Sequence, residues 1–347
     1  MKKILDTIID LQLFAEVNPN VNGTYSNTTG NNLSAENKEF YDMRLIDAAV
    51  PQLVHDQFGQ KRPIPKNGGK TISFRKFSSL PKATSPLVEG VPPTGGKLDV
   101  SEIRSTVNQY GDFVALTDML ELTSLDNTVA ETVKLIGNQA GLTLDTITRN
   151  ILQSGTNVMY APKQTADGKT AVTSRANLDA TCKLTVDLVN RVAAKLRAKN
   201  APTINGDYIA IIHPYVAYDI MRDPEWIDAH KYATPENLYA GEIGKIGGVR
   251  FVQTSEAKIY GSEDGAPSGT AVFGCLFLAD GAYGITDITG GGLETIIKQK
   301  GSGGTSDPLN QKSTIGWKAT KTAEILVPER IVRVECTSEF SDSATAN

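Results

Sequence analysis

The chain has 347 residues, of which 40% are hydrophobic and 21% charged, and its formal net charge is −4. This is the composition of an ordinary globular protein of about two domains, and no apolar run approaches the roughly 18 residues that a membrane-spanning helix needs. A mildly acidic chain has no overall attraction to nucleic acid, and three distant cysteines, Cys182, Cys275 and Cys336, argue against a disulfide framework or a cysteine-based zinc site.

The first residues imitate a secretion signal, with two lysines ahead of apolar side chains. Because Asp6, Asp10 and Glu16 interrupt the apolar run, we expect a short amphipathic helix and no secretion. Residues 18–32 are mostly Asn, Thr and Gly, which predicts an extended arm. Helical order is expected to begin at Ser34, whose hydroxyl can cap a helix.

Two strand patterns flank a segment rich in proline and glycine. Residues 71–77 and 100–116 alternate apolar and polar side chains, and Gly111 predicts a bulge or bend in the second. Together they predict one long hairpin with an irregular tip from about Leu80 to Lys97. With about 20 extended residues in each arm, it would reach roughly 65 Å. The hairpin should therefore leave its own subunit and lie on a neighbouring copy.

Charge is distributed unevenly around this hairpin. Seven basic residues and no acidic residue lie between Gln57 and Val88, whereas seven acidic residues and two basic ones lie from Glu89 to Asp126. This pattern favours docking of a basic hairpin on an acidic partner surface over nucleic-acid binding, because few aromatic residues accompany the cations. The candidate interface residues are Arg62, Lys66, Lys70, Arg75, Lys76, Lys82 and Glu89.

A long amphipathic helix is predicted over residues 126–153, with Asp126 as its cap. At about 1.5 Å per residue it would be around 40 Å long. Apolar side chains recur every three or four residues, so that one face of the helix should be buried. The candidate core residues include Val129, Val133, Ile136 and Ile147.

The middle of the chain alternates helix and strand patterns and reads as a mixed α/β domain. Thr185 should cap one helix, and Pro214 should lie in the first turn of another. Strands are predicted at residues 207–213, 248–254, 270–279 and 293–299. Two further strands, at residues 313–327 and 330–336, are expected to close one sheet beside the long helix.

Catalytic, metal and cofactor motifs are not found, and the chain is not predicted to be an enzyme. PIPKNGGKT and YAGEIGKIGG each lack the first glycine of a phosphate-binding loop. His55, His213 and His230 have no metal-ligand spacing and read as packed or surface histidines. His213 ends an apolar strand, but no nucleophile accompanies it. No catalytic, cofactor-binding or metal-ligating residue is therefore assigned.

The order of these elements resembles that of tailed-bacteriophage major capsid proteins of the Hong Kong 97 type. The resemblance covers residues 37–339 and includes the stretches YDMRLIDAAVPQLVHDQFGQ, GGKTISFRKFSSL, VEGVPPTGGKLDV, YGDFVALTDMLEL and DPLNQKSTIGWKA. It implies an α+β fold of four parts. These are an N-terminal arm (1–55), an extended loop or E-loop (60–114), a peripheral domain with a spine helix (116–160 and 308–340), and a mixed α/β axial domain (175–300).

The resemblance also implies a function. The chain would self-assemble through hexamers and pentamers into the icosahedral head shell of a tailed bacteriophage, and enclose double-stranded DNA without sequence-specific contacts. Scaffolding and portal proteins, and in some heads decoration proteins, would be its partners, whereas a membrane and a cofactor would not. It would be assembled in the host cytoplasm and reside in the virion. A separate scaffolding protein is expected instead of cleavage of a long N-terminal segment, and covalent cross-linking is not predicted.

Two other interpretations remain open at this point. An encapsulin-like compartment shell shares the fold but encloses cargo enzymes, so neighbouring genes would separate it from a capsid. A β-rich surface or adhesion protein would also suit segments rich in Asn, Thr and Gly. The long amphipathic helix and the absence of a secretion signal count against that second alternative.

Overall fold

A computed structural model describes residues 53–77, 80–84, 86, 89–90, 95–124, 128–165, 168–230, 242–302 and 307–347. Almost all of the expected N-terminal arm lies outside these residues, and so do the predicted caps Ser34 and Asp126. Residues 49–347 belong to one unit. That unit contains two main β-sheets and five helices of six or more residues among its described residues, in agreement with the predicted α+β class.

The first sheet is organised by one long strand, β15 (Lys312–Ile325). β4 (Asn108–Thr117) pairs with it antiparallel along ten residues, from Lys312 opposite Thr117 to Lys321 opposite Asn108. β14 (Glu294–Lys298) and β13 (Tyr283–Thr286) pair with other parts of β15, and the short strand β1 (Gln60–Lys61) extends the sheet beyond β13. Four strands distant in sequence are therefore held together through one strand.

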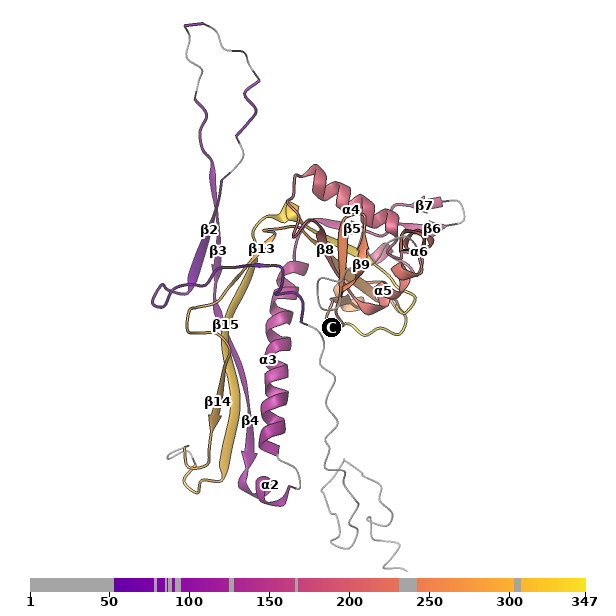
Figure 1. The fold of residues 1–347 in the computed structure, drawn as a ribbon. Helices are drawn as coiled ribbons and strands as arrows, with labels where there is room; N and C mark the ends of the chain where they lie inside the picture. The colour runs from indigo at the N-terminus through magenta and orange to yellow at the C-terminus, as the bar shows by residue number, and fades with distance from the viewer. Residues whose placement is uncertain are drawn as a thin grey trace, which may run out of the picture. The chain divides into compact units, whose positions relative to one another are not determined.

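The helix α3 (Thr128–Gln153) lies alongside β15, as Figure 1 shows. Alternate residues of β15, namely Ile315, Trp317 and Ala319, face it because side chains of a strand alternate between the two sides of a sheet. They form one apolar cluster with Leu116 of β4 and with Ile136 and Ala140 of the helix. The short helix α2 (Asp118–Thr123) follows β4 and precedes α3. The predicted long helix is thus confirmed from residue 128.

The hairpin is shorter than the sequence predicts. β2 (Thr71–Phe77) and β3 (Val100–Thr106) pair antiparallel over seven residues each, and the single second strand expected at 100–116 is divided at Val107. Its second half is β4, which pairs with β15. The predicted bulge at Gly111 is wrong, because the register of β4 on β15 is unbroken. A side chain at Gly111 would come within 2.5 Å of the Trp317 carbonyl oxygen, so close strand packing accounts for this glycine.

A seven-stranded sheet forms the second body of the unit, which we call the axial body. Its strands are, in order, β5 (Val158–Tyr160), β16 (Ile331–Cys336), β12 (Val272–Leu278), β8 (Tyr208–Ile212), β10 (Val249–Gln253) and β9 (Glu242–Ile246), with β11 (Ile259–Tyr260) on β12. Every residue of β8 and β12 is buried. The helices α4 (Val186–Ala198), α5 (Pro214–Met221) and α6 (Pro224–His230) contribute to the same apolar cluster as this sheet. The small hairpin of β6 (Lys163–Thr165) and β7 (Gly168–Thr170) follows β5.

The last two strands differ from expectation because they do not share a sheet. β15 belongs to the first sheet, whereas β16 lies between β5 and β12 in the axial body. A 3₁₀ turn at Pro328–Arg330 separates them and breaks the strand, since Pro328 cannot donate a backbone hydrogen bond. β13 and β14 likewise pair with β15, although they fall within the range expected for the axial domain.

The caps of two axial helices agree with the sequence. Thr185 precedes α4, and its Oγ1 accepts a hydrogen bond from the backbone N–H of Leu188 (3.4 Å). α5 has Pro214 at its start, and the backbone N–H of Tyr215 donates to Nδ1 of His213 (3.2 Å). His213 is buried against the Phe273 ring, with 5.1 Å between ring centroids. Its burial lowers the pKa of His213 to about 4.

Residues 54–58 enter the fold through buried polar contacts. The backbone N–H of His55 donates to Oδ1 of Asp145 on α3 (3.0 Å), and its ring Nδ1 lies 2.6 Å from Oδ2. The neighbouring Asp56 accepts a hydrogen bond from Thr148 (2.6 Å) and pairs with the Lys321 ammonium group on β15. This polar clamp joins the start of the described chain to both α3 and β15, and removing one member would leave a buried group unpaired.

Two glycine substitutions test the packing of β15. An alanine at Gly316 would place its Cβ 2.8 Å from Cβ of Phe113 and 2.9 Å from the Asp112 carbonyl oxygen. We expect Gly316→Ala to lower the free energy of unfolding by about 1–3 kcal/mol. Gly137→Ala is the matched control, because its Cβ meets no atom within 4 Å on α3. It should stabilise by about 0.5–1 kcal/mol. Urea unfolding of dispersed subunits measures both, and equal effects would contradict the proposed strand packing.

His213 should make the fold sensitive to acid. Its ordinary pKa of 6.5 is lowered to about 4 in the folded chain, so below pH 6.5 the unfolded chain binds a proton that the folded chain does not. This contribution to stability is full above pH 6.5 and is lost as the pH falls towards 4. His213→Asn keeps a capping oxygen but cannot titrate. Between pH 7 and pH 4, we expect the variant to lose about 3 kcal/mol less stability than the wild type. Identical pH profiles in urea unfolding would refute this role.

Candidate functional site

The basic residues predicted on the hairpin lie on the surface. Arg62, Lys66 and Lys70 are exposed on the segment that leads into β2, Arg75 is exposed on β2, and Lys82 and Glu89 are exposed beyond the paired strands. Lys76 is half-buried, and its Nζ lies 3.7 Å from a carboxylate oxygen of Glu329. The structure spreads these seven residues along the hairpin and its approach, and their part in an interface stays a prediction.

The paired strands of the hairpin are anchored in their own fold by a few contacts. Phe74 is buried on β2 and lies beside Gly284 of β13. On the other strand, Ser105 is buried and its Oγ lies 3.0 Å from Oγ1 of Thr322 on β15. The backbone N–H of Val107 donates to the Lys70 carbonyl oxygen (2.8 Å). Towards the end of β2, Lys76 also lies near Glu329, and along their seven residues the two strands pair with each other.

The far end of the hairpin exposes apolar side chains, a feature that sequence reasoning missed. Phe77 is 64% exposed and lies opposite Val100 in the register, and Leu98 is 70% exposed. Leu80 and Leu98 lie in the segments that follow β2 and precede β3. We call Phe77, Leu80, Leu98 and Val100 the hairpin patch. These four apolar residues are visible in the sequence, but the prolines and lysines between Phe77 and Val100 indicate turns and surface charge and not an apolar patch.

Charge on the two hairpin strands is partly compensated. Arg104 donates to Glu102 on the same strand (3.0 Å), and Ser73 of β2 donates to the same carboxylate. The hydrogen bond from Ser73, and then that from Arg104, lower the pKa of Glu102. Glu102 is therefore ionised at neutral pH and offsets Arg104, which leaves the remaining positive charge on β2 and its approach.

A second apolar surface surrounds α2. None of the six residues of this helix is buried, and Met119, Leu120 and Leu122 are exposed, the last by 76%. Phe113 of β4 is also exposed. We call Phe113, Met119, Leu120 and Leu122 the α2 patch. Acidic groups accompany it, because Asp118 and Glu121 lie in the same helix.

Glu121 fixes one edge of the α2 patch. Its carboxylate lies 2.7 Å from Nζ of Lys300 and accepts a hydrogen bond from Ser313 of β15 (2.8 Å). The bond to Lys300, and then that to Ser313, lower the pKa of Glu121. The acidic charge beside the apolar residues is thus held in place on the rigid end of β15.

The candidate core residues of α3 differ in burial. Ile136 is buried in the cluster with β15, while Val129 and Val133 are partly buried against the same cluster. Ile147 is partly buried and stands outside that cluster. Near the C-terminal end of the helix, most of the buried positions are polar, although Leu152 is also buried there. Asp145, Thr148, Arg149 and Gln153 all make hydrogen bonds there, a pattern that apolar periodicity alone could not indicate.

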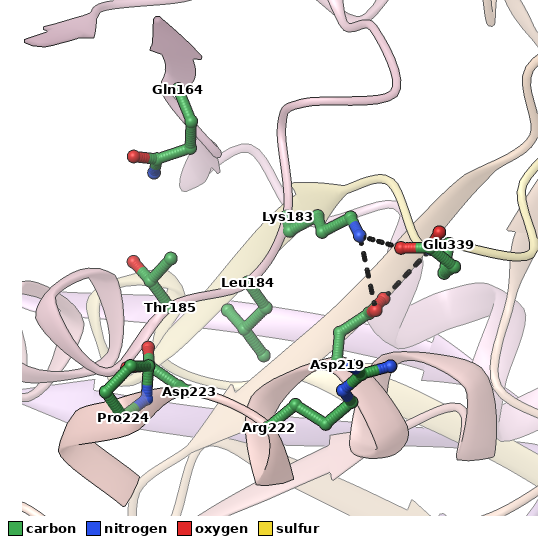
Figure 2. A pocket seen from close by; sticks show the side chains of 9 residues that line it. All are labelled: Gln164, Lys183, Leu184, Thr185, Asp219, Arg222, Asp223, Pro224 and Glu339. Carbon is green, nitrogen blue, oxygen red and sulfur yellow. Dashed lines mark hydrogen bonds and ion pairs between the residues drawn. The ribbon is translucent and has the colours of Figure 1, made fainter. Parts of the chain in front are cut away.

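A polar pocket of about 520 Å³ lies on the axial body, as Figure 2 shows. Lys183 pairs with Glu339 and lies 3.7 Å from a carboxylate oxygen of Asp219. The Lys183 ammonium group lowers the pKa of Glu339. The lining also includes Arg222, Asp223, Gln164, Leu184, Thr185 and Pro224. These groups can bind charged or polar side chains, and the lining residues contain no serine, cysteine or histidine that could act as a nucleophile or imidazole base.

The histidines with described side chains have structural roles. His55 belongs to the polar clamp, and His213 caps α5 against Phe273, whereas the side chain of His230 lies outside the described residues. Within the described ranges, no group of three His, Cys, Asp or Glu side chains has the arrangement of a metal site. In the same part of the chain, no helix is long and apolar enough to cross a membrane.

Comparison with solved structures identifies the fold. The capsid protein of cyanophage P-SCSP1u is 14% identical, with a TM-score of 0.65 over 89% of this chain and 95% of its own. The capsid of Ralstonia phage GP4 is 13% identical, with a TM-score of 0.65 over 93% of this chain and 100% of its own. The capsid of cyanophage Pam1 is 13% identical, with a TM-score of 0.66, and the match covers 91% of this chain and 99% of the Pam1 chain. These similarities show the Hong Kong 97-type fold expected from the sequence.

No curated protein matches the chain. A family model described as phage capsid protein matches residues 101–334, which run from β3 to β16 and include both main sheets, α3 and the axial helices. This match spans about two thirds of the sequence. The chain therefore belongs to the phage capsid protein family, and it is a major capsid protein of the phage head shell.

Proposed function

We propose that the hairpin of each subunit is a strap that docks on the α2 patch of a neighbouring copy in the shell. The observation that carries this proposal is the pair of unburied apolar surfaces, the hairpin patch and the α2 patch, within one chain. A two-stranded ribbon is marginally stable alone, and a six-residue helix with no buried residue also needs support. Contact between copies would stabilise both elements.

Charge supports the same pairing. Arg62, Lys66, Lys70 and Arg75 are exposed on the hairpin and its approach, while Asp118 flanks the α2 patch, where Glu121 is already paired with Lys300. Exposed ion pairs contribute only about 0–1 kcal/mol each to binding. We therefore propose that they determine how the two surfaces align and which partner is chosen. Apolar burial supplies most of the free energy, at roughly 2.5 kcal/mol for each 100 Å² removed from water. Repetition around a closed shell turns such modest contacts into a stable container.

The finer features of assembly belong to the same proposal. Subunits form hexamers and pentamers, scaffolding and portal proteins direct closure, and the finished shell encloses double-stranded DNA through non-specific contacts. Assembly takes place in the host cytoplasm. We keep the four-part division predicted from the sequence with changed membership, because β5 and β16 join the axial sheet while β1, β4, β13 and β14 join the sheet of β15. The chain has a structural role and carries out no catalysis.

Removal of the strap should separate folding from assembly. Deleting residues 79–96 leaves the pairing of β2 with β3 and the core of β15 in place, so we expect a folded subunit that forms no closed particles. Leu98→Asp should reduce the particle fraction at least about tenfold, because it places a charge in the hairpin patch. Size-exclusion chromatography and electron microscopy measure particles, and circular dichroism measures folding.

The control for this experiment is Lys97→Gln, which changes an exposed polar residue next to Leu98. We expect it to assemble within about threefold of the wild type, since a single exposed charge contributes little. Normal closed particles from both the deletion variant and Leu98→Asp would show that the hairpin is not the strap.

A further inference from the structure

The axial body exposes large apolar side chains in one place. Among its described residues, those exposed side chains are Tyr215, Tyr218 and Met221 on α5 and Ile227 on α6. The rest of the large apolar side chains in this body are buried or partly buried. Apolar groups gathered on one face of an otherwise polar surface mark an interaction site, whereas scattered ones do not.

The aromatic rings on this face pack against one another. The Phe340 ring centroid lies 4.7 Å from that of Tyr215 and 5.4 Å from that of Tyr218. Arg222 donates to the Tyr218 hydroxyl oxygen (2.6 Å). We call Tyr215, Tyr218, Met221, Arg222, Ile227 and Phe340 the tyrosine face. Tyr, Met and Arg are the residue types enriched in protein interfaces, and rings already held rigid lose little entropy on docking.

Acidic residues and the polar pocket adjoin the tyrosine face. Figure 2 shows Asp219 of α5 facing Lys183 and Glu339, with Arg222, which follows α5, also lining the pocket. Carboxylates outnumber cations here, because only Lys183 and Arg222 are basic. The five carboxylates on or beside α5 and α6 belong to Asp219, Asp223, Glu225, Asp228 and Glu339. The pocket can hold a long basic side chain.

The opposite end of α4 carries the complementary charge. The first turn of this helix lies beside the pocket, where Asp223 accepts a hydrogen bond from the backbone N–H of Val186 (3.0 Å). Its last turn lies about 20 Å away along 13 residues, and there Arg197 donates to the Gly247 carbonyl oxygen in the turn between β9 and β10. Arg197 and Lys199 lie at this basic end of α4, and Lys245 of β9 and Arg250 of β10 both pair with Asp207.

We propose that the tyrosine face and the polar pocket of one axial body dock on the basic end of α4 in the next copy of the chain. Every copy then offers both halves of the contact, which is the arrangement that closes a ring of identical subunits head to tail. Opposite charges set the register, and Tyr215 and Tyr218 supply the buried anchor. This inference rests on the proposed function, because it names the contact that would join axial bodies within a capsomer.

A charge exchange tests this contact. The acidic side is reversed by Glu225→Lys with Asp228→Lys, and the basic side by Arg197→Glu with Lys199→Glu. We expect each double variant to reduce the fraction of chain in closed particles at least about tenfold, and the quadruple variant to recover to within about threefold of the wild type. Lys298→Glu, an exposed lysine on β14 outside the axial body, is the control and should assemble normally. Circular dichroism confirms that each variant folds.

The outcomes separate this inference from the proposed function. If the wild type forms particles but a double variant also does, or the quadruple variant is no better than the doubles, the axial contact is wrong and the strap is unaffected. If neither the wild type nor Lys298→Glu forms particles, even with the other head proteins of its phage, both proposals fail. Particles that form normally but lose a different bound protein would also overturn the contact between copies.

Discussion

The pairing of β15 with its neighbours is the constraint on which the rest of the fold depends. This one strand holds β4 along ten residues, carries β13 and β14, and presents Ile315, Trp317 and Ala319 to the long helix. The close approach of β4 requires glycine at both 111 and 316, because a Cβ at either position would meet backbone or Cβ atoms of the partner strand within 3 Å. The polar clamp then fixes Lys321 of β15 to Asp56.

β15 also determines how the two bodies are connected. Only the turn Pro328–Arg330 separates it from β16, and β16 is interior to the axial sheet. Glu335 of β16 is fully buried between Arg175, at 2.6 Å, and Arg333, at 2.9 Å. A buried carboxylate with two guanidinium partners is costly to break, so this end of the connection is fixed. The five residues 326–330, which include this turn, therefore connect the two sheets.

Much of the fold could be predicted from the sequence, because its local signals agree with the tertiary structure. The periodicity of α3, the cap at Thr185, Pro214 at the start of α5 and the apolar runs of β8 and β12 each indicated the correct element. The sequence did not indicate which of the two sheets each strand joins. Strands β15 and β16 carry the same alternating pattern, and only long-range pairing decides that they separate.

The candidate interfaces show the same division between local and long-range information. The basic residues of the hairpin were visible as a run of charge, but the apolar pairing of Phe77 with Val100 depends on a register across more than twenty residues. The α2 patch was hidden for a different reason. Met119, Leu120 and Leu122 are exposed in the structure, and their apolar side chains alone do not distinguish a surface patch from a core. The tyrosine face likewise combines α5 with Phe340, over 100 positions away.

The unsupported hairpin has a consequence for the life of the free subunit. Before assembly, β2 and β3 each have one edge without a partner strand, and they end in four exposed apolar side chains. Such ribbons pair readily with any other exposed strand. The lysines on β2 and its approach, together with the prolines near the tip, reduce that hazard by repulsion and by removing backbone donors. The exposed edges and apolar side chains of the hairpin thus limit the solubility of the unassembled chain, and a short lifetime of the free subunit limits its aggregation.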